Sequence, residues 1–450
     1  MRKLFGTDGI RGVAGQYPLD TDTVFRIGSS LAKHLSGAGA VKVVIGQDTR
    51  ESSEWIADTL TAGLESEGAT AVSAGVVTTP AVAYLARTEG FAAGVVVSAS
   101  HNPWQDNGIK VFGHDGFKLP DATELEIEKE IFAQIKEGVA PKGHMRTGSL
   151  PGEHELAEKY ERWLAEFERG VDMSRFKLVV DCANGAASAV APELFPLLGM
   201  TKTVFTHFTP NGRNINDRCG ALHPEVVAKE VVEQQAELGV CFDGDADRAL
   251  FADHTGKIVN GDAVLLLTAR ALKAQGKLKA DTVVATTMSN MGLEAALKRE
   301  GIKMLRAPVG DKYVLEEMQK TGAVLGGEQS GHIIFSDLAT TGDGLLTALK
   351  VIEVVAKSGK KLAELVGDMQ VYPQVIKNVR VREKKPLEQI DEVSAKIAAA
   401  STDLRDEGRV VVRYSGTEAL CRVMIEAASE EKMNLHAEAI AGAIRRSIGV

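Results

Sequence analysis

Three aspartates at alternate positions, Asp243, Asp245 and Asp247, directly follow the apolar run of residues 239–242. If the backbone there is extended, alternate side chains point the same way, so the three carboxylates lie together. The apolar run and Gly244 favour a strand end over a helix, on which Asp245 would face away from the other two. Like charges packed together need a neutralising cation, and Mg²⁺ prefers hard oxygen ligands. The spacing therefore predicts a Mg²⁺ site, and the alternative is an exposed acidic loop.

A serine-bearing loop follows another apolar run. Residues 94–97 read Gly-Val-Val-Val, and the segment Ser98-Ala99-Ser100-His101-Asn102-Pro103 comes next. A serine beside a histidine is a candidate nucleophile, although neighbours in sequence need not hydrogen-bond and the loop is not the G-x-S-x-G elbow of hydrolases. Ser, Asn and Pro also favour turns. From the residues alone, a catalytic serine and a plain turn both stay open.

Two segments place arginines where they could bind phosphate. The first is Arg413-Tyr414-Ser415-Gly416-Thr417-Glu418, with Arg422 close behind. Two hydroxyls, backbone N–H groups exposed by a glycine and two guanidinium groups suit phosphate oxygens, and a hairpin turn is the alternative. The second segment is residues 5–12, in which three glycines accompany the single Arg11. A tight phosphate-binding loop and a plain turn explain it equally well.

Another polar segment, residues 327–332, mixes four kinds of hydrogen-bonding side chain. It offers the carboxylate of Glu328, the amide of Gln329, the hydroxyl of Ser330 and the imidazole of His332. The hydroxyls of a sugar both donate and accept hydrogen bonds, so such a mixture suits a polyol. We therefore expect this segment to be a sugar-binding loop.

Composition narrows the classes of function. The 450 residues are 44% apolar and 25% charged, which is typical of a soluble globular protein. The net charge of −9 argues against nucleic-acid binding, which needs a basic surface. No run approaches about 18 uninterrupted apolar residues, so we expect no membrane span. An anionic substrate would need a locally basic pocket, for which the motif segments supply Arg11, Lys110, Arg248, Arg413 and Arg422.

The cysteines indicate a reducing compartment. The four residues, Cys182, Cys219, Cys241 and Cys421, contain no C-x-x-C pair. This spacing suggests neither a zinc site nor a disulfide framework. The first eight residues become polar and glycine-bearing too early for a signal peptide. We expect reduced thiols and a cytoplasmic protein.

Short apolar runs that end in polar, glycine-bearing loops recur along the chain. They begin near residues 41, 94, 177, 239, 282 and 323, and helical patterns lie between them at 51–66, 223–237 and 290–301. Strands that alternate with helices indicate βαβ units, whose ligands bind beyond the carboxyl ends of the strands. The six runs form three pairs, so we expect three related α/β domains with mixed, mainly parallel sheets around a central cleft.

The last part of the chain predicts a smaller α+β domain. We expect strands at 378–382, 409–413 and 421–425, and helices at 386–400 and 432–446. Polar, Gly- and Pro-bearing residues 141–153 and 366–375 are the expected linkers. The predicted domains are 1–153 with the serine loop, 154–254 with the aspartate loop, 255–367 with the sugar loop, and 368–450 with the phosphate loop.

Taken together and in this order, the segments resemble the α-D-phosphohexomutases. The resemblance rests on F-G-T-D-G-I-R-G, S-A-S-H-N-P followed by residues 106–110, D-G-D-A-D-R, G-E-Q-S-G-H and R-x-S-G-T-E. It runs from Lys3 to about Glu426, and five ordered motifs argue against a chance match. The first motif and G-E-Q-S-G-H resemble in particular the bacterial members that act on glucosamine phosphate.

The resemblance implies a fold and a set of roles. It implies four domains around a central cleft, a phosphoryl group carried on Ser100, and a homodimer. Mg²⁺ would be held by the Ser100 phosphate, Asp243, Asp245 and Asp247. The sugar would be held by Glu328, Ser330 and His332. The phosphate that does not react would be held by Arg413, Ser415, Gly416, Thr417 and Arg422. The reacting phosphate would lie beside Arg11, His101 and Lys110.

Three residues depart from the family pattern. Ala246 stands where glycine is commoner, which costs energy if that position has a positive φ. Ala419 stands where proline is usual, so the phosphate loop loses rigidity. Lys312 stands where arginine is usual, which removes a bidentate donor. None of the three is the serine or one of the aspartates.

The implied activity is the interconversion of glucosamine 6-phosphate and glucosamine 1-phosphate through a phosphoserine enzyme and a bisphosphate. Its product would feed amino-sugar nucleotide and cell-wall precursor synthesis. A phosphoglucomutase or phosphomannomutase with the same mechanism is the first alternative. A non-catalytic phosphosugar-binding protein is the second, and intact Ser100 and the three aspartates argue against it.

Overall fold

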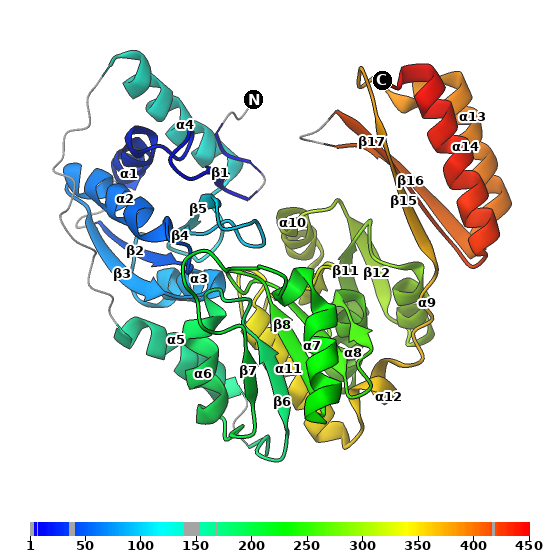
Figure 1. The fold of residues 1–450 in the computed structure, drawn as a ribbon, viewed down its shortest axis with the longest axis horizontal. Coiled ribbons are helices and arrows are strands. Elements are labelled where there is room, and N and C mark those ends of the chain that lie inside the picture. Colours follow the sequence, from blue (N-terminus) through cyan, green and yellow to red (C-terminus); the bar gives the residue numbers. More distant parts are fainter. Residues whose placement is uncertain (1–3, 7, 36–40, 139–153, 168–169, 416–418) are drawn as a thin grey trace. The chain divides into compact units, whose positions relative to one another are not determined.

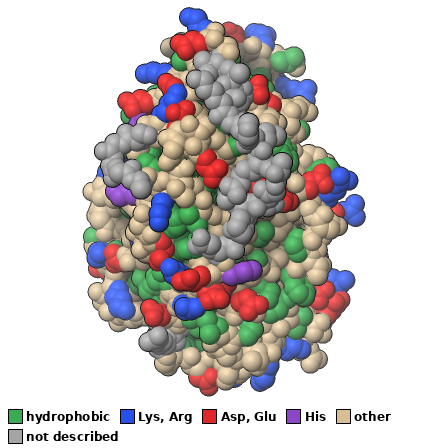
Figure 2. Space-filling view, turned by 90° about the vertical axis from the view of Figure 1, so that its left-hand side faces the viewer, with side chains coloured by type: hydrophobic (Ala, Val, Ile, Leu, Met, Phe, Trp, Pro, Cys, Tyr) green, Lys and Arg blue, Asp and Glu red, His purple; other side chains and the backbone are tan. Residues whose placement is uncertain are grey.

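The computed structural model describes residues 4–6, 8–35, 41–138, 154–167, 170–415 and 419–450. The chain divides into two compact units, Met1–Thr286 with Leu305–Gly367 and Thr287–Met304 with Asp368–Val450 (Figure 1). No helix within the described ranges is both long and apolar enough to cross a membrane. On the face drawn in Figure 2, described acidic and basic side chains lie intermingled and form no single basic patch.

The first sheet of the larger unit has the strand order β1-β5-β4-β2-β3. Strand β2 pairs in parallel with β3 and β4, whereas β5 pairs antiparallel with β4 and β1. The strands are β1 (Ile10–Val13), β2 (Lys42–Gln47), β3 (Thr70–Val76), β4 (Ala93–Val97) and β5 (Asp106–Gly113). One apolar core joins this sheet to α1 (Thr21–Leu35), α2 (Ser53–Ser66) and α4 (Asp121–Lys136). Helix α3 (Thr79–Thr88) packs against β2 and β4.

The second sheet repeats this arrangement in the order β10-β9-β8-β6-β7. Strand β6 pairs in parallel with β7 and β8, and β9 pairs antiparallel with β8 and β10. The strands are β6 (Leu178–Asp181), β7 (Val204–Thr206), β8 (Leu238–Phe242), β9 (Ala249–Asp253) and β10 (Ile258–Val259). The helices of this region are α5 (His154–Phe167), α6 (Ala187–Leu197) and α7 (Pro224–Gln234).

The third sheet has the order β12-β11-β13-β14. Strand β13 pairs in parallel with β11 and antiparallel with β14. The strands are β11 (Thr282–Thr286), β12 (Lys303–Ala307), β13 (Leu325–Gly327) and β14 (Ile333–Phe335). The helices of this part of the chain are α8 (Gly261–Ala274), α9 (Met291–Arg299), α10 (Asp311–Thr321), α11 (Gly344–Ser358) and α12 (Leu362–Val366).

The same connection recurs in all three sheets. In each, a strand with a parallel partner leads through a polar loop into an antiparallel neighbour: β4 into β5, β8 into β9, and β13 into β14. The serine, aspartate and sugar loops therefore occupy equivalent places, at the carboxyl ends of parallel strands, where α/β sheets bind ligands. Strands β4 and β8 are buried along their whole length, as expected for strands covered on both faces.

The smaller unit contains an antiparallel sheet in the order β15-β17-β16, formed by β15 (Gln374–Arg380), β17 (Leu420–Ala427) and β16 (Gly408–Tyr414). Helices α13 (Asp391–Leu404) and α14 (Glu430–Ile448) share a core with one face of this sheet. The predicted α+β class is confirmed. The helix expected from residue 386 begins instead at Asp391, because Pro386 is followed by a short 3₁₀ turn at Leu387–Gln389.

The predicted linkers have different outcomes. Residues 367–373 join α12 to β15 without forming a helix or strand, as expected for a linker. The predicted linker at 141–153 lies outside the described residues. The four domain boundaries stay predictions.

Candidate active site

Ser100 occupies the loop between β4 and β5 and is almost completely buried, at 1% exposure. Its Oγ donates to Asp243 Oδ2 at 2.6 Å, and the Nδ1 atom of its neighbour His101 lies 3.2 Å from the same Oγ. The serine has a φ of +52°, a left-handed conformation that non-glycine residues rarely adopt. Such backbone strain persists only where the surroundings enforce it.

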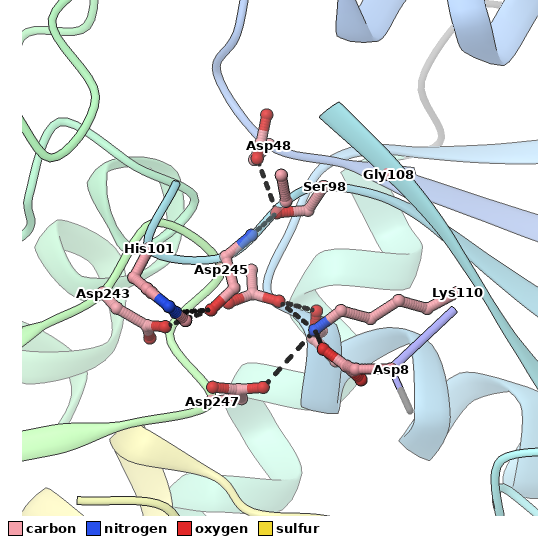
Figure 3. A network of polar contacts seen from close by, with 12 residues as sticks. Asp8, Asp48, Ser98, His101, Gly108, Lys110, Asp243, Asp245 and Asp247 are labelled. Carbon is pink, nitrogen blue, oxygen red and sulfur yellow. Dashed lines mark hydrogen bonds and ion pairs between the residues drawn. The ribbon is translucent and has the colours of Figure 1, made fainter. Parts of the chain in front are cut away.

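Polar side chains enforce this conformation from both sides of the loop. Ser98 Oγ accepts from the Ser100 backbone N–H at 3.0 Å and donates to Asp48 Oδ2 at 2.6 Å (Figure 3). Arg50 Nη2 donates to the carbonyl oxygen of Ser100 at 3.1 Å, and Asn216 Nδ2 donates to the same oxygen at 2.9 Å. The serine is therefore held through its N–H and its C=O, which leaves its Oγ to face the aspartates.

The aspartate loop follows β8, and its three carboxylates converge as predicted. One carboxylate oxygen from each of Asp243, Asp245 and Asp247 lies within 4.8 Å of the other two, and all three side chains are buried. The expected extended backbone is wrong, because the loop turns and Ala246 has a φ of +54°. Alanine therefore bears the left-handed strain that glycine would relieve. A β-carbon on Gly244 would lie 2.5 Å from the Ser100 carbonyl oxygen, so the two loops touch through this glycine.

The charges of the aspartate loop fit a hard cation. Burial raises the pKa of Asp243 to about 7, and the nearby carboxylates of Asp247 and Asp245 add to this shift. Among the residues that the structure describes, no group hydrogen-bonds to the buried oxygens Asp245 Oδ1 and Asp247 Oδ1. Convergent oxygen atoms with unsatisfied negative charge are the donor set that Mg²⁺ prefers. The loop is therefore a candidate metal site.

Lys110 partly balances these charges from β5. Its Nζ lies 2.8 Å from Asp245 Oδ2, 3.5 Å from Asp247 Oδ2 and 3.1 Å from Asp8 Oδ2 (Figure 3). Burial opposes the lysine charge, but Asp245, Asp8 and Asp247 outweigh it and raise the pKa of Lys110 well above its usual value. Lys110 is therefore a fixed cation in this structure. Asp8 also pairs with Arg11 and Lys118.

Of the three residues expected beside the reacting phosphate, Arg11 and His101 lie at the serine loop. Arg11 Nη1 donates to the carbonyl oxygen of Ala99 at 3.3 Å. Burial lowers the pKa of His101 to about 4, and the cations Arg248 and Arg11 add to this shift. The His101 imidazole is therefore neutral at physiological pH, which lets it accept a proton beside Ser100.

A buried network supports the aspartate loop from behind. Thr79 Oγ1 donates to Asp245 Oδ2 at 2.5 Å, and its backbone N–H donates to the Asp245 carbonyl oxygen at 2.9 Å. Tyr160 of α5 donates to the Asp343 carboxylate at 2.9 and 3.0 Å. Asp343 caps α11 by accepting from Leu346, and the next residue, Gly344, donates to the Ala246 carbonyl oxygen at 3.0 Å. Three helices, α3, α5 and α11, thus support the aspartate loop.

The predicted sugar residues fall into two settings. Glu328 and Ser330 are partly exposed, and Glu328 Oε1 accepts from the Gly310 N–H at 3.0 Å. His332 is buried, its Nδ1 lies 3.6 Å from Asp247 Oδ1, and its Nε2 accepts from the Gly342 N–H at 3.0 Å. Both ring nitrogens of His332 therefore face protein groups, so the ring is placed to orient Asp247. Its predicted contact with sugar stays a prediction.

The predicted phosphate residues belong to the smaller unit. Arg413 and Arg422 lie opposite each other on β16 and β17. They line a cavity of about 300 Å³ together with Asn378 of β15 and the apolar Met288, Ile376, Val411 and Met424. Ser415 is buried at the end of β16, and Lys384 donates to its carbonyl oxygen at 2.7 Å. Gly416 and Thr417 lie outside the described residues.

Sequence reasoning missed several residues that hold the site. Asp48 and Arg50 stand in a polar loop after β2 that was recognised as a strand end but given no role. Asp8 stands inside the first family motif and was likewise unassigned. Thr79 lies in a largely apolar segment, and Asn216 lies in a polar segment that was given no role. Only the folded chain connects them with Asp245 and Ser100.

Family comparisons match the whole chain. Residues 2–137, 161–256 and 260–372 match the alpha/beta/alpha domains I, II and III of phosphoglucomutase/phosphomannomutase, and residues 376–443 match its C-terminal domain. The chain is 62% identical to the phosphoglucosamine mutase of Koribacter versatilis, with 100% of this chain and 98% of the relative covered. It is 53% identical to the phosphoglucosamine mutase of Solibacter usitatus, at 100% and 99% coverage.

Solved structures share the fold. A phosphoglucomutase/phosphomannomutase family protein from Burkholderia thailandensis has a TM-score of 0.80 at 24% identity, and the comparison covers 100% of both chains. The N-acetylphosphoglucosamine mutase of Aspergillus fumigatus has a TM-score of 0.68 at 20% identity, covering 99% of this chain and 96% of that one. With four matching domains and full-length relatives above 50% identity, the chain belongs to the phosphoglucomutase/phosphomannomutase family and, within it, to the phosphoglucosamine mutases.

Proposed function

We propose that this protein interconverts glucosamine 6-phosphate and glucosamine 1-phosphate by transferring a phosphoryl group to and from Ser100. The observation that carries the proposal is the 2.6 Å hydrogen bond between Ser100 Oγ and Asp243. It places a serine hydroxyl against a cluster of carboxylates in a chain whose full-length relatives are named phosphoglucosamine mutases. The product would feed amino-sugar nucleotide and cell-wall precursor synthesis.

The aspartate loop would hold one Mg²⁺ together with the Ser100 phosphate. Asp243, Asp245 and Asp247 supply the oxygen ligands, and the structural relative from Aspergillus fumigatus is described in complex with magnesium. When bound, the ion neutralises negative charge on the phosphoryl oxygens, which is the main requirement of phosphoryl transfer. Lys110 would add a second positive charge beside Asp245 and Asp247.

Side chains of the serine loop would carry the phosphoryl group and the proton during transfer. A sugar hydroxyl would attack phosphorus, so that a new O–P bond forms while the O–P bond to Ser100 breaks. The hydroxyl proton would leave for a neutral acceptor, and Ser100 Oγ would regain a proton when its phosphate departs. His101, neutral at physiological pH and 3.2 Å from Ser100 Oγ, is placed to move that proton. The second half-reaction would repeat these steps in reverse with the other end of the bisphosphate.

Binding of the sugar would be divided between two groups of residues. Glu328 and Ser330, with His332 orienting Asp247, would form the sugar side of the larger unit. Arg413, Ser415 and Arg422, with Gly416 and Thr417, would bind the phosphate that does not react. The cavity that Arg413 and Arg422 line supports this assignment, because Asn378 adds a hydrogen-bonding group there.

A coupled assay with glucosamine, glucose and mannose phosphates tests the proposed substrate. We expect the highest kcat/KM for glucosamine phosphate, whereas a preference for glucose or mannose phosphate would favour the alternative phosphoglucomutase or phosphomannomutase. Intact-mass and peptide analysis of the purified protein should find partial phosphorylation at Ser100. A cytoplasmic homodimer is part of the proposal, and light scattering after size exclusion measures the oligomeric state.

A further inference from the structure

A second cluster of metal-ligating side chains lies at the carboxyl end of β6, away from the aspartate loop in sequence. It consists of Asp181, the last residue of β6, His207, the first residue after β7, and Cys219, which precedes a short 3₁₀ turn at Gly220–Leu222. A carboxylate oxygen, an imidazole nitrogen and the thiol sulfur all lie within 4.8 Å of one another. The proposed phosphoryl transfer uses none of these three side chains.

The Asp181 carboxylate is satisfied differently from that of Asp48, which follows the corresponding strand β2. Asp48 accepts from the hydroxyls of Ser53 and Ser98 and pairs with the buried guanidinium of Arg50. Asp181 is also fully buried, but its two oxygens accept from the backbone N–H groups of Ala183 and Gly220, at 2.9 and 3.0 Å. The Asp181 carboxylate also lies beside the His207 imidazole, so this buried negative charge can attract a cation.

The distance between the Asp181 carboxylate and the His207 imidazole fits two ligands of one metal ion. Asp181 Oδ2 and His207 Nδ1 lie 3.2 Å apart, but the buried Nδ1 forms no hydrogen bond of good geometry with any residue in the described ranges. Bonds of about 2.0–2.2 Å to a tetrahedral zinc ion would hold oxygen and nitrogen ligands about 3.3–3.5 Å apart. The pair therefore needs little movement to share an ion, and Cys219 supplies a sulfur ligand on the same side.

We propose that Asp181, His207 and Cys219 bind a divalent ion of the zinc class. Thiolate and imidazole ligands select zinc-like ions, whereas the all-oxygen aspartate loop selects Mg²⁺, so the two sites would differ in their preferred metal. On binding, the Cys219 thiol loses its proton and the imidazole is neutral. The thiolate and the Asp181 carboxylate then balance the two positive charges of the ion, which makes a neutral buried centre.

Separation along the sequence explains why cysteine spacing indicated no zinc site. The three ligands come from three segments, and C-x-x-C or similar local patterns are absent between residues 181 and 219. The His207 side chain is 33% exposed, which gives an ion an entry path from solvent. Bound metal would fix the segment 207–219, which also carries Asn216, the residue that donates to the Ser100 carbonyl oxygen.

Cobalt(II) tests the proposal, since it replaces zinc and its bond to thiolate absorbs in the near ultraviolet. Protein freed of metal with a chelator and returned to millimolar Mg²⁺ should bind one Co²⁺ with thiolate absorption, and Zn²⁺ should displace it. Cys219→Ser should abolish the absorption and raise the Zn²⁺ dissociation constant at least about 100-fold. Cys241→Ser removes a buried thiol of the same sheet that lies outside the cluster, so it should leave both readouts unchanged.

Absence of thiolate absorption at saturating Co²⁺ would overturn the proposal, as would an absorption that survives Cys219→Ser. Loss of the absorption in Cys241→Ser, with retention in Cys219→Ser, would also reject this ligand set. If Cys219→Ser does not fold, as judged by thermal unfolding, His207→Asn decides, because its partly exposed side chain tolerates replacement and its loss should weaken Zn²⁺ binding about 10- to 100-fold. These readouts do not depend on mutase activity.

Discussion

The serine–aspartate centre and the arginine-lined cavity hold charge in opposite ways. Ser100, Asp243, Asp245 and Lys110 are each at most 1% exposed, and they stand on or beside loops with left-handed residues. Arg413 and Arg422 are only partly buried and project from regular antiparallel strands. The first region concentrates charge in a dry, fixed centre, whereas the second presents charge from an ordinary sheet surface.

This difference predicts how tolerant each region is. In the buried centre Ser100, Asp243 and Lys110 have fixed partners, so a lost group leaves another charge uncompensated. On the sheet surface solvent can replace a lost partner, so substitution should weaken binding more than it disturbs structure. We therefore expect the centre to determine whether transfer occurs and the cavity to determine how well substrate binds.

The largest effect is expected at the serine itself. Ser100→Ala should lower mutase activity by at least about four orders of magnitude, because the phosphoryl carrier is lost. Ser98→Ala is the matched control: it removes the bonds to Asp48 and to the Ser100 N–H but not the carrier, so a roughly tenfold loss is expected. Peptide mass spectrometry should find phosphate on Ser100, and finding it on Ser98 instead would reassign the carrier.

Removing the metal or one of its ligands should have the next largest effect. Chelation should stop turnover, and Asp245→Ala should raise the barrier by several kcal/mol, about the size found for other electrostatic stabilisers. Asp245 also accepts from Thr79, and Thr79→Val keeps the carboxylate while removing this bond, so it should cost much less. Full activity in chelator, measured by the coupled assay, would reject the metal assignment.

Substitutions in the arginine-lined cavity should mainly weaken the binding of the phosphosugar substrate. Arg413→Ala should cost about 1.5–3 kcal/mol, or a rise of roughly 10- to 150-fold in KM, because a charge-assisted contact to phosphate is lost. Released bisphosphate should also increase, while phosphorylation of Ser100 should persist. Lys377→Ala is the control, since this lysine of β15 pairs with Glu438 of α14 and does not line the cavity. Loss of Ser100 phosphorylation in Arg413→Ala would show that the arginine serves the reacting phosphate instead.

Local sequence patterns were sufficient to predict the position of a site residue where a single segment of the chain determines it. Asp243, Asp245 and Asp247 come together because all three belong to one strand end, and the strand–loop pattern placed Ser100 at the end of β4. The strands β5 and β9 were not foreseen, and they supply the antiparallel pairings of the first two sheets. Strand β5 also carries Lys110 to the aspartates.

Contacts between distant segments could not be predicted in this way. The hydrogen bond from Asn216 to Ser100 joins residues 116 positions apart, and that from Tyr160 to Asp343 joins residues 183 apart. The prediction of an extended backbone in the aspartate loop was wrong for a related reason. Gly344 donates to the Ala246 carbonyl oxygen, and this distant contact helps hold the left-handed turn, which local propensity would not favour.

The smallest effect is expected at Asp343, and it concerns stability. This residue acts on the buried centre through Gly344 and the first turn of α11. Burial raises the pKa of Asp343 to about 6, above the value of about 3.9 expected in the unfolded chain. Between about pH 4 and pH 6 the folded protein therefore binds more protons than the unfolded chain. The contribution of this group to the free energy of unfolding must then fall as pH rises through that window, and stay constant above it. Two pKa units correspond to at most about 3 kcal/mol.

Asp343→Asn cannot ionise, yet its Oδ1 can still accept from Leu346 and Tyr160, so the variant should lose this pH dependence. The free energy of unfolding of the variant, measured by denaturant titration from pH 4 to pH 7.5 and compared with wild type, should rise relative to wild type by about 2–3 kcal/mol across the window. Tyr160→Phe keeps the Asp343 carboxyl group but removes a hydrogen-bond donor to the charged carboxylate. The free energy of unfolding of this variant should therefore fall with rising pH at least as steeply as that of wild type. Parallel profiles for wild type and Asp343→Asn would show that the carboxyl group is already ionised at pH 4. In that case the groups around Asp343 would stabilise the charged carboxylate, and the start of α11 would be more polar than the burial of Asp343 indicates.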